Sequence, residues 1–227
     1  MLAAPIIRAV NPAGASTTST QSPPRTSGKL VHSARAYDLL VWILLGGRGR
    51  AYYRRLLDLA QVTPGQVVLD IGCGTGSLAI AATRRVGDAG LIYGIDGAVE
   101  MIEHARRKAA KARVDATFTH AVVEEIPFPD DHFDTILCSL MFHHLRRAVR
   151  EQCAREMYRV LKPGGKALVV EFSRDGKSVI SRLHKHAALE LSGIHDVLRS
   201  AGFDIAESGL VGIQGLNYTL AAMPGSP

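Results

Sequence analysis

The chain has 227 residues, of which 47% are hydrophobic and 21% are charged. This length suits one large domain with its own core, and this composition argues against a fully disordered chain. The formal net charge of +6 leaves an anionic partner open. The basic residues occur as scattered pairs, such as Arg54 with Arg55 and Arg84 with Arg85, which favours solvated helix faces over one nucleic-acid stripe.

Three cysteines, Cys73, Cys138 and Cys153, are present, and no two of them form a CxxC pair. This pattern argues against a disulfide framework or a structural zinc site and favours a reducing compartment. No apolar run approaches the about 20 residues that span a bilayer, and Pro5 and Arg8 interrupt any signal-type core. We therefore expect a cytoplasmic protein without a transmembrane segment.

The first part of the chain divides into two predicted regions. Residues 1–28 are rich in Ala, Ser, Thr and Pro and have no periodic apolar face, which predicts a disordered tail. Residues 29–62 carry apolar side chains at helical spacing, interrupted at Gly46 and Gly47. We expect two helices joined by a glycine hinge, and we expect them to form a lid over the rest of the protein.

Residues 63–227 form the predicted main domain, in which short β-rich runs alternate with helical patterns. Strands are expected at 67–71, 91–95, 116–120, 135–139 and 166–172. Helices are expected at 77–85, 99–112 and 148–160. Strands that alternate with helices predict a parallel sheet with helices on both faces.

The last part of the chain departs from this alternation. Helices are expected at 178–191 and 194–201, the first of them within a helical insertion at 176–192. Strands at 205–211 and 216–222 then follow each other without a helix, so they must pair as a hairpin. The expected fold class is therefore α/β, with a seven-stranded, mostly parallel sheet and an antiparallel terminal strand.

The strongest local signal is the run VVLDIGCGTGSLAIAA at residues 67–82. A buried strand leads directly into Gly72, Gly74 and Gly76 and then into an apolar helix. Glycines permit positive φ and close approach of a ligand, and the helix directs its free N–H groups and positive dipole end at the same place. The pattern predicts a site for a nucleoside-bearing ligand. A dinucleotide is the first rival, but Ser77 stands where the third glycine of that fingerprint would fall.

Asp96 ends the next predicted strand, about twenty residues beyond the glycines. A carboxylate at that strand tip can accept hydrogen bonds from both hydroxyls of a ribose. The alternative is a helix cap for the segment that contains Met101 and Ile102. We favour the ribose interpretation.

Five motifs occur in a definite order: DIGCGTG from Asp70, GID ending at Asp96, IPFPDDHFD from Ile126, RVLKPGG from Arg159 and LRSAGF from Leu198. On these motifs the chain, over residues 35 to 223, resembles the class I S-adenosylmethionine-dependent methyltransferases, closest to the ubiquinone/menaquinone biosynthesis C-methyltransferase type with its methyltransferase type 11 domain. The resemblance implies a Rossmann-like fold. EFS at 171–173 and YDLL at 37–40 are similar to the quinone branch, whereas MFHHL replaces its Arg-Asn signature.

The resemblance also implies S-adenosylmethionine as the cofactor and a set of residues that hold it. The glycine loop with Asp70 would hold the methionine end, Asp96 the ribose, and Gly97 with Met101 the border of the adenine. Val122 stands where the family carries an Asp for the adenine amino group, so backbone groups around Val123 and Glu124 are expected to take that role. The implied cofactor set is Asp70, Gly72, Cys73, Gly74, Gly76, Asp96, Gly97, Met101, Val123, Glu124 and Ser139.

Catalytic candidates lie where this fold places its substrate. Methyl transfer from a sulfonium can rely largely on positioning and desolvation, and a base is needed only where the acceptor must lose a proton. The candidates are His143 and His144 after the fourth strand, Glu171 at the end of the fifth, and Tyr37 on the lid; a capping or packing role is the alternative for each.

No metal is expected in this chain. His184 and His186 stand two residues apart on a predicted helix and would face different directions, without a carboxylate cluster beside them.

The leading hypothesis is methyl transfer to a small, apolar or aromatic acceptor, such as a quinone-like compound, a lipid or a secondary metabolite. The alternatives are a non-catalytic cofactor-binding protein, an RNA or protein methyltransferase, and an NAD oxidoreductase, which the glycine spacing disfavours. Nucleic acid is not the expected partner. Peripheral membrane contact and the choice between monomer and homodimer stay open.

Overall fold

A computed structural model describes residues 34, 38, 41, 43, 45–173, 190–212 and 215–225. The expected tail at 1–28, the catalytic candidate Tyr37, the insertion at 176–192 and the pair His184 and His186 lie wholly or mostly outside these residues. The boundaries proposed for the tail, the lid and the insertion therefore stay predictions.

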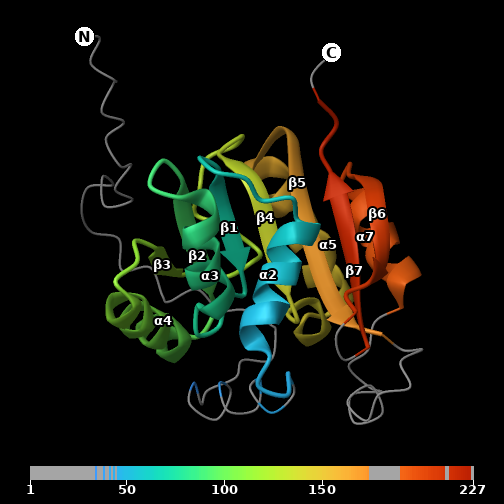
Figure 1. The fold of residues 1–227 in the computed structure, drawn as a ribbon. Helices are drawn as coiled ribbons and strands as arrows, with labels where there is room; N and C mark the ends of the chain where they lie inside the picture. The colour runs from blue at the N-terminus through green and yellow to red at the C-terminus, as the bar shows by residue number, and fades with distance from the viewer. Residues whose placement is uncertain are drawn as a thin grey trace.

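Seven strands form one sheet in the order β3-β2-β1-β4-β5-β7-β6 (Figure 1). Six pairings join these strands. Those among β1 to β5 are parallel, and β7 is antiparallel to both of its neighbours. The strands are β1 (Val67–Ile71), β2 (Leu91–Asp96), β3 (Thr117–His120), β4 (Phe133–Ser139), β5 (Leu161–Phe172), β6 (Asp204–Leu210) and β7 (Leu216–Ala222).

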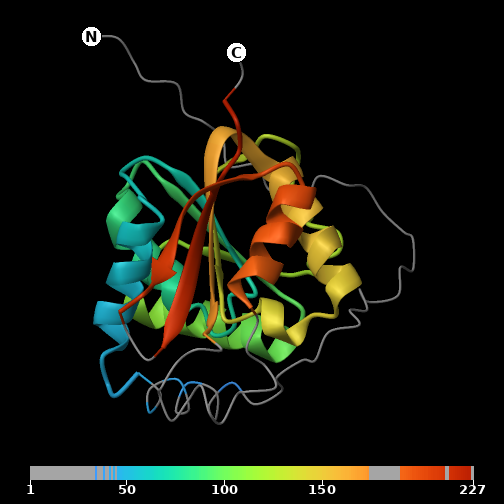
Figure 2. The same ribbon diagram turned by 90° about the vertical axis from the view of Figure 1, so that its right-hand side faces the viewer.

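Helices cover both faces of this sheet, as Figure 2 shows when the molecule is viewed along the sheet. One face carries α2 (Gly49–Leu59), α3 (Ser77–Val86) and α4 (Val99–Ala112), and the other carries α5 (Arg147–Val160) and α7 (Leu191–Ser200). Each face has its own buried cluster, because the central strands are apolar on both sides. A short 3₁₀ helix, η1 (Phe142–His144), follows β4.

The expected fold class is confirmed, and most element boundaries agree within two residues. β5 is the largest difference, since it begins at Leu161 rather than 166 and pairs across an irregularity with Phe133 of β4. The antiparallel strand β7 lies between β5 and β6, so β6 forms the sheet edge. Before α2, the predicted hinge is a turn in which Gly46 and Gly47 have φ of 55° and 74°.

The strand order reverses between β1 and β4, because the chain leaves β1 toward β2 and β3 and then returns to β4 on the other side. In open α/β sheets this reversal opens a crevice outside the carboxyl ends of the strands, and ligands bind there. Within the described part of the chain, no helix is long and apolar enough to cross a membrane.

Candidate functional site

The glycine loop between β1 and α3 lies at this reversal. Gly72, Gly74 and Gly76 all have positive φ, as the sequence predicted for the loop. A Cβ at Gly72 would stand 2.3 Å from Cγ of Met141, and one at Gly76 would stand 2.8 Å from the ring of Phe118. Both positions therefore require glycine for packing as well as for backbone conformation.

Asp70 is buried just before the loop, near the carboxyl end of β1. Its Oδ2 accepts a hydrogen bond of 3.1 Å from the backbone N–H of Ala79 in α3. Burial raises the pKa of Asp70 to about 8, the Ala79 hydrogen bond lowers it, and the nearby Asp96 raises it further. A cationic group bound beside Asp70 would offset this cost, because an opposite charge favours the ionised carboxylate.

Asp96 ends β2 and links the glycine loop to the start of α4. Its Oδ2 accepts from the N–H of Gly74 at 2.9 Å, and its Oδ1 accepts from the N–H of Ala98 at 2.8 Å. Burial raises the pKa of Asp96, while these two hydrogen bonds and the neighbouring His120 lower it. The N-cap of α4 is Ala98 and no side chain caps this helix, so the helix-cap interpretation of Asp96 is wrong. Each oxygen of a carboxylate has a second acceptor direction, so both oxygens of Asp96 can still accept from ribose hydroxyls.

The remaining predicted cofactor residues surround the same edge of the sheet. Cys73 is buried, and burial raises the pKa of its thiol, which keeps the thiol neutral. Gly97 contacts Nε2 of His120 through its carbonyl at 3.1 Å, and Met101 is buried in the first turn of α4. Val123 is buried and Glu124 is half-buried in the turn after β3.

A cavity of ≈ 50 Å³ opens beside the loop, lined by Asp70, Gly72 and Cys73, by Tyr52 of α2 and by Ser139 at the end of β4. Tyr52 Oη and Ser139 Oγ are 2.8 Å apart and share a hydrogen bond. A space of this size suits the charged end of a ligand rather than a whole nucleoside. Sequence analysis identified Ser139 but treated Tyr52 only as an apolar helix position.

A polar cluster joins the segment before α2 to the glycine loop. Thr75 Oγ1 donates to Oδ1 of Asp38 at 2.5 Å. Lys108 of α4 donates to Oδ2 of Asp38 at 3.1 Å and to Oγ of Ser77 at 2.6 Å, and His104 Nε2 lies 3.3 Å from Oδ2 of Asp38. Sequence analysis missed this cluster, although Asp38 stands in the quoted YDLL motif, because its partners are distant in the chain.

Two of the catalytic candidates form a buried pair. His143 Nδ1 lies 2.7 Å from Oε2 of Glu171, and the backbone N–H of His143 donates to Oε1 at 3.3 Å. The side chains are 8% and 0% exposed, so water competes little for either contact. With Glu171 ionised, Nδ1 carries the proton and Nε2 of His143 is left as an acceptor. The ring of His144 lies 4.0 Å from that of His143, centroid to centroid.

Of the candidates named from the sequence, those that the structure describes lie at one edge of the sheet, and Tyr37 is outside the described residues. Gly72 and His143 come from different loops, but Met141, two residues before His143, packs its side chain against Gly72. No cluster of three or more potential metal ligands occurs among the described residues.

Comparison with known proteins identifies the class to which this fold and site belong. Residues 68–165 match a family described as a methyltransferase domain. Residues 68–165 therefore match a methyltransferase domain, and the fold of the chain is one that S-adenosylmethionine-dependent methyltransferases also adopt.

Among curated proteins, the chain is similar to the ubiquinone/menaquinone biosynthesis C-methyltransferase UbiE. It is 36% identical over 163 residues to that of Azotobacter vinelandii, which covers 70% of this chain and 64% of the relative. It is 36% identical over 159 residues to that of Vibrio campbellii, which covers 69% of this chain and 61% of the relative. The chain thus spans less than two thirds of the length of these relatives.

Solved structures share the fold at lower identity. An S-adenosylmethionine-dependent methyltransferase from Aquifex aeolicus has a TM-score of 0.71 and 21% identity, over 85% of this chain and 100% of that one. The [4+2]-cyclase SpnF has a TM-score of 0.66 and 20% identity, over 78% of this chain and 82% of that one. The same architecture therefore occurs in proteins named for different reactions.

The residues of the site fit S-adenosylmethionine in their chemistry. Asp70 is a buried carboxylate beside a small cavity, suited to an ammonium group, and Asp96 retains acceptor directions for hydroxyls. Between them, a loop without side chains at Gly72 and Gly74 leaves the backbone accessible to a ligand.

Proposed function

We propose that this chain transfers a methyl group from S-adenosylmethionine to a small, apolar or aromatic acceptor. The observation that carries the proposal is the glycine loop at the sheet reversal, flanked by Asp70 and Asp96 and sharing its edge with the His143–Glu171 pair. The similarity to UbiE supports a quinone-like ring as the acceptor.

Asp70, with Gly72 and the cavity at Ser139, would hold the methionine end, and Asp96 would hold the ribose. Gly97, Met101, Val123 and Glu124 would border the adenine. When bound, the cofactor supplies an electrophilic methyl group. This chain would orient that group, exclude water from it and present the acceptor atom in line with it.

His143 is the proposed general base. Its Nε2 would take a proton from the acceptor, while Glu171 holds the ring through Nδ1 and stabilises the imidazolium that forms. This arrangement suits a carbon or oxygen acceptor that must lose a proton, such as a hydroquinone ring. His144 stays a second candidate, and Tyr37 lies outside the described residues.

Three buried free cysteines support a reducing compartment, and we place the protein in the cytoplasm on that basis. The acceptor is proposed as a small molecule.

The first experiment is binding followed by product identification. Calorimetry with S-adenosylmethionine and with its demethylated product is expected to show binding by the wild type and a loss of about tenfold to a hundredfold in Asp96→Ala, since charge-assisted hydrogen bonds are lost. Labelled cofactor and fractionated cell extract are then expected to give a labelled product in the apolar fraction. A polar labelled product would remove the quinone-like acceptor, and absence of binding would remove the cofactor.

Cofactor binding without methyl transfer is the second candidate, because a cyclase shares the fold. It predicts tight binding in calorimetry and no labelled product from any fraction. The two measurements together therefore separate the candidates.

A further inference from the structure

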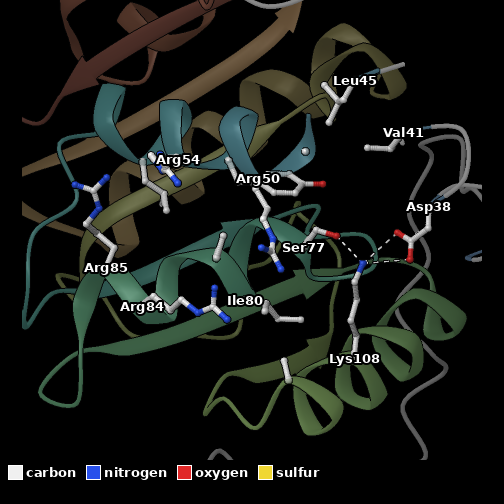
Figure 3. Close-up of a pocket in the computed structure, with 15 residues that line it drawn as sticks. Asp38, Val41, Leu45, Arg50, Arg54, Ser77, Ile80, Arg84, Arg85 and Lys108 are labelled. Carbon is white, nitrogen blue, oxygen red and sulfur yellow. Dashed lines mark hydrogen bonds and ion pairs between the residues drawn. The ribbon is translucent and has the colours of Figure 1, made fainter. Parts of the chain in front are cut away.

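A groove of ≈ 810 Å³ lies on the helical face that carries α2, α3 and α4 (Figure 3). The groove is larger than the cavity beside the glycine loop, and the two share the lining residues Asp38, Val41, Tyr53 and Ser77. The proposed function assigns no role to this groove.

The groove is strongly basic. Arg50, Arg54, Arg84, Arg85 and Lys108 line it, against one carboxylate, Asp38. Arg85 forms an ion pair with Asp58, and Lys108 forms one with Asp38. Among the described residues, no ion-pair partner exists for the other three arginines. The groove therefore presents three uncompensated guanidinium groups.

These three charges are also close to one another in the fold. Arg50 and Arg54 stand one turn apart on α2, a spacing at which like charges repel. Figure 3 shows the side chains of Arg50 from α2 and Arg84 from α3 reaching toward the same part of the groove, near Ile80. An anion bound there would relieve the repulsion and accept hydrogen bonds from the guanidinium groups.

The apolar part of the lining includes Val41 and Ile80, which are half-buried, and Leu45 and Leu57, which are buried. Ile43 lies between Val41 and Leu45 in the chain but does not line the groove itself, and it is 58% exposed, although it is a large hydrophobic residue. Exposed apolar side chains beside basic residues are typical of surfaces that bind the interface of an anionic membrane. Inorganic phosphate or RNA would not use the apolar part.

We propose that this groove, which we call the basic groove, docks the protein on a membrane surface that contains anionic phospholipids. Arg50, Arg54 and Arg84 bind lipid phosphates, and Ile43 enters the headgroup region. Docking itself does not rest on the proposed function. The consequence of docking does rest on the proposed function. Because the groove adjoins the glycine-loop cavity, docking would bring that edge of the sheet near a bilayer that holds an apolar acceptor.

The test uses the full chain and vesicles of phosphatidylcholine with or without phosphatidylglycerol. We expect sedimentation with the anionic vesicles at low salt and release as salt rises. The variant Arg50→Gln/Arg54→Gln/Arg84→Gln is expected to lose about fivefold in partitioning per arginine, or roughly a hundredfold in total. The matched control is Arg146→Gln/Arg147→Gln/Arg155→Gln, which removes the same charge beside the other face of the sheet and is expected to bind almost as the wild type does.

Equal losses in the two triple variants would overturn the proposal, since net charge alone would then explain binding. The proposal would also be overturned if inorganic phosphate released the protein from the vesicles more than chloride does at equal ionic strength. Binding of the protein to RNA but not to vesicles would overturn it as well. Ile43→Ser, which keeps every charge, is expected to weaken vesicle binding without changing RNA binding. Calorimetry with S-adenosylmethionine is expected to be unchanged in the groove variant, so failure of docking is distinguishable from failure of the proposed function.

Discussion

The proposed cofactor end and the proposed acceptor end of the site are built in different ways. At the cofactor end, Asp70, the glycine loop and the start of α3 lie in one continuous run of residues 67–82, and backbone groups make many of the contacts. At the acceptor end, His143 and Glu171 are 28 residues apart and meet only because β4 and β5 are neighbours.

Each half contains a buried carboxylate, and the two carboxylates differ in their partners. Asp70 has one backbone donor within the protein, and its pKa is raised to about 8. Glu171 has two donors from His143. On the proposed function, we expect Asp70 to receive a cation from a ligand, whereas Glu171 already has an internal partner in His143.

The largest effect is expected at the acceptor end. His143→Gln should lower kcat by about a hundredfold to ten-thousandfold, because a general base contributes that much to proton transfer, while cofactor affinity in calorimetry stays unchanged. Glu171→Gln should lower kcat less and move the acidic side of the pH profile, because the general base acts only when unprotonated and Glu171 contacts its ring. His144→Gln is the matched control. If His143→Gln retained full rate and His144→Gln did not, the base would be His144.

The next effect concerns the glycine loop. Gly72→Ala should cost about 2–4 kcal/mol in the free energy of unfolding and abolish cofactor binding, because its Cβ would overlap Met141 and its φ is positive. Gly65→Ala is the control, since Gly65 has φ +83° but no neighbour within 4 Å of its Cβ. It should lose about 1–2 kcal/mol and keep binding. Equal costs in urea unfolding would mean that Met141 moves aside freely.

A third prediction concerns pH. The folded-state pKa of Asp70 is raised, so its contribution to stability is fully present below the ordinary carboxyl pKa and is lost as pH rises through about 8. Relative to Asp70→Asn, the wild type should lose up to about 1.4 kcal/mol of unfolding free energy per pH unit in that window. Urea unfolding of both proteins at several pH values measures this difference. A constant difference across the window would show that Asp70 is ionised throughout.

The same carboxylate links pH to ligand binding. An ammonium group beside Asp70 favours its ionised form, so affinity for S-adenosylmethionine should increase as pH rises toward 8 and protons should be released on binding. Calorimetry in buffers of different ionisation enthalpy measures that release. Asp70→Asn provides the control for titration of the ligand itself.

The smallest effect is expected at Tyr52. Tyr52→Phe removes the hydrogen bond to Ser139 and should cost about 1 kcal/mol in unfolding free energy, with a similar loss in cofactor affinity. Thermal unfolding and calorimetry measure the two quantities. Ser139→Ala should lose the same bond, and the double variant should lose less than the sum of the two single losses, because both residues contribute to that bond.

The sequence was sufficient for most of the fold because each element carried a local signal. β1, α4 and β7 have the predicted boundaries, since their apolar periodicity begins and ends sharply. The early start of β5 was missed because Pro163, Gly164 and Gly165 are unfavourable in strands. Gly164 has φ of 77°, and tertiary contacts hold this stretch: Leu161 pairs with Phe133 of β4, and Gly164 and Gly165 hydrogen-bond with Met223.

The candidate site was predictable to the extent that it is local. The glycine loop follows the end of β1 and Asp96 ends β2, and the apolar runs of the sequence predict both strand ends. The His143–Glu171 pair and the Asp38–Lys108 contact depend on which strands and helices become neighbours, and no spacing in the chain encodes that. Sequence analysis could therefore name His143 and Glu171 as separate candidates, but not as a pair.

The position of β7 has a consequence for how the protein is made. β7 pairs along its whole length with β5 and also holds β6, which has no other neighbour among the described strands. During synthesis, the edges of β5 and β6 that pair with β7 must therefore stay open until residues 216–222 have left the ribosome. Because Glu171 lies opposite Asn217 in this pairing, the partner of the proposed base His143 acquires its final surroundings only after β7 has formed.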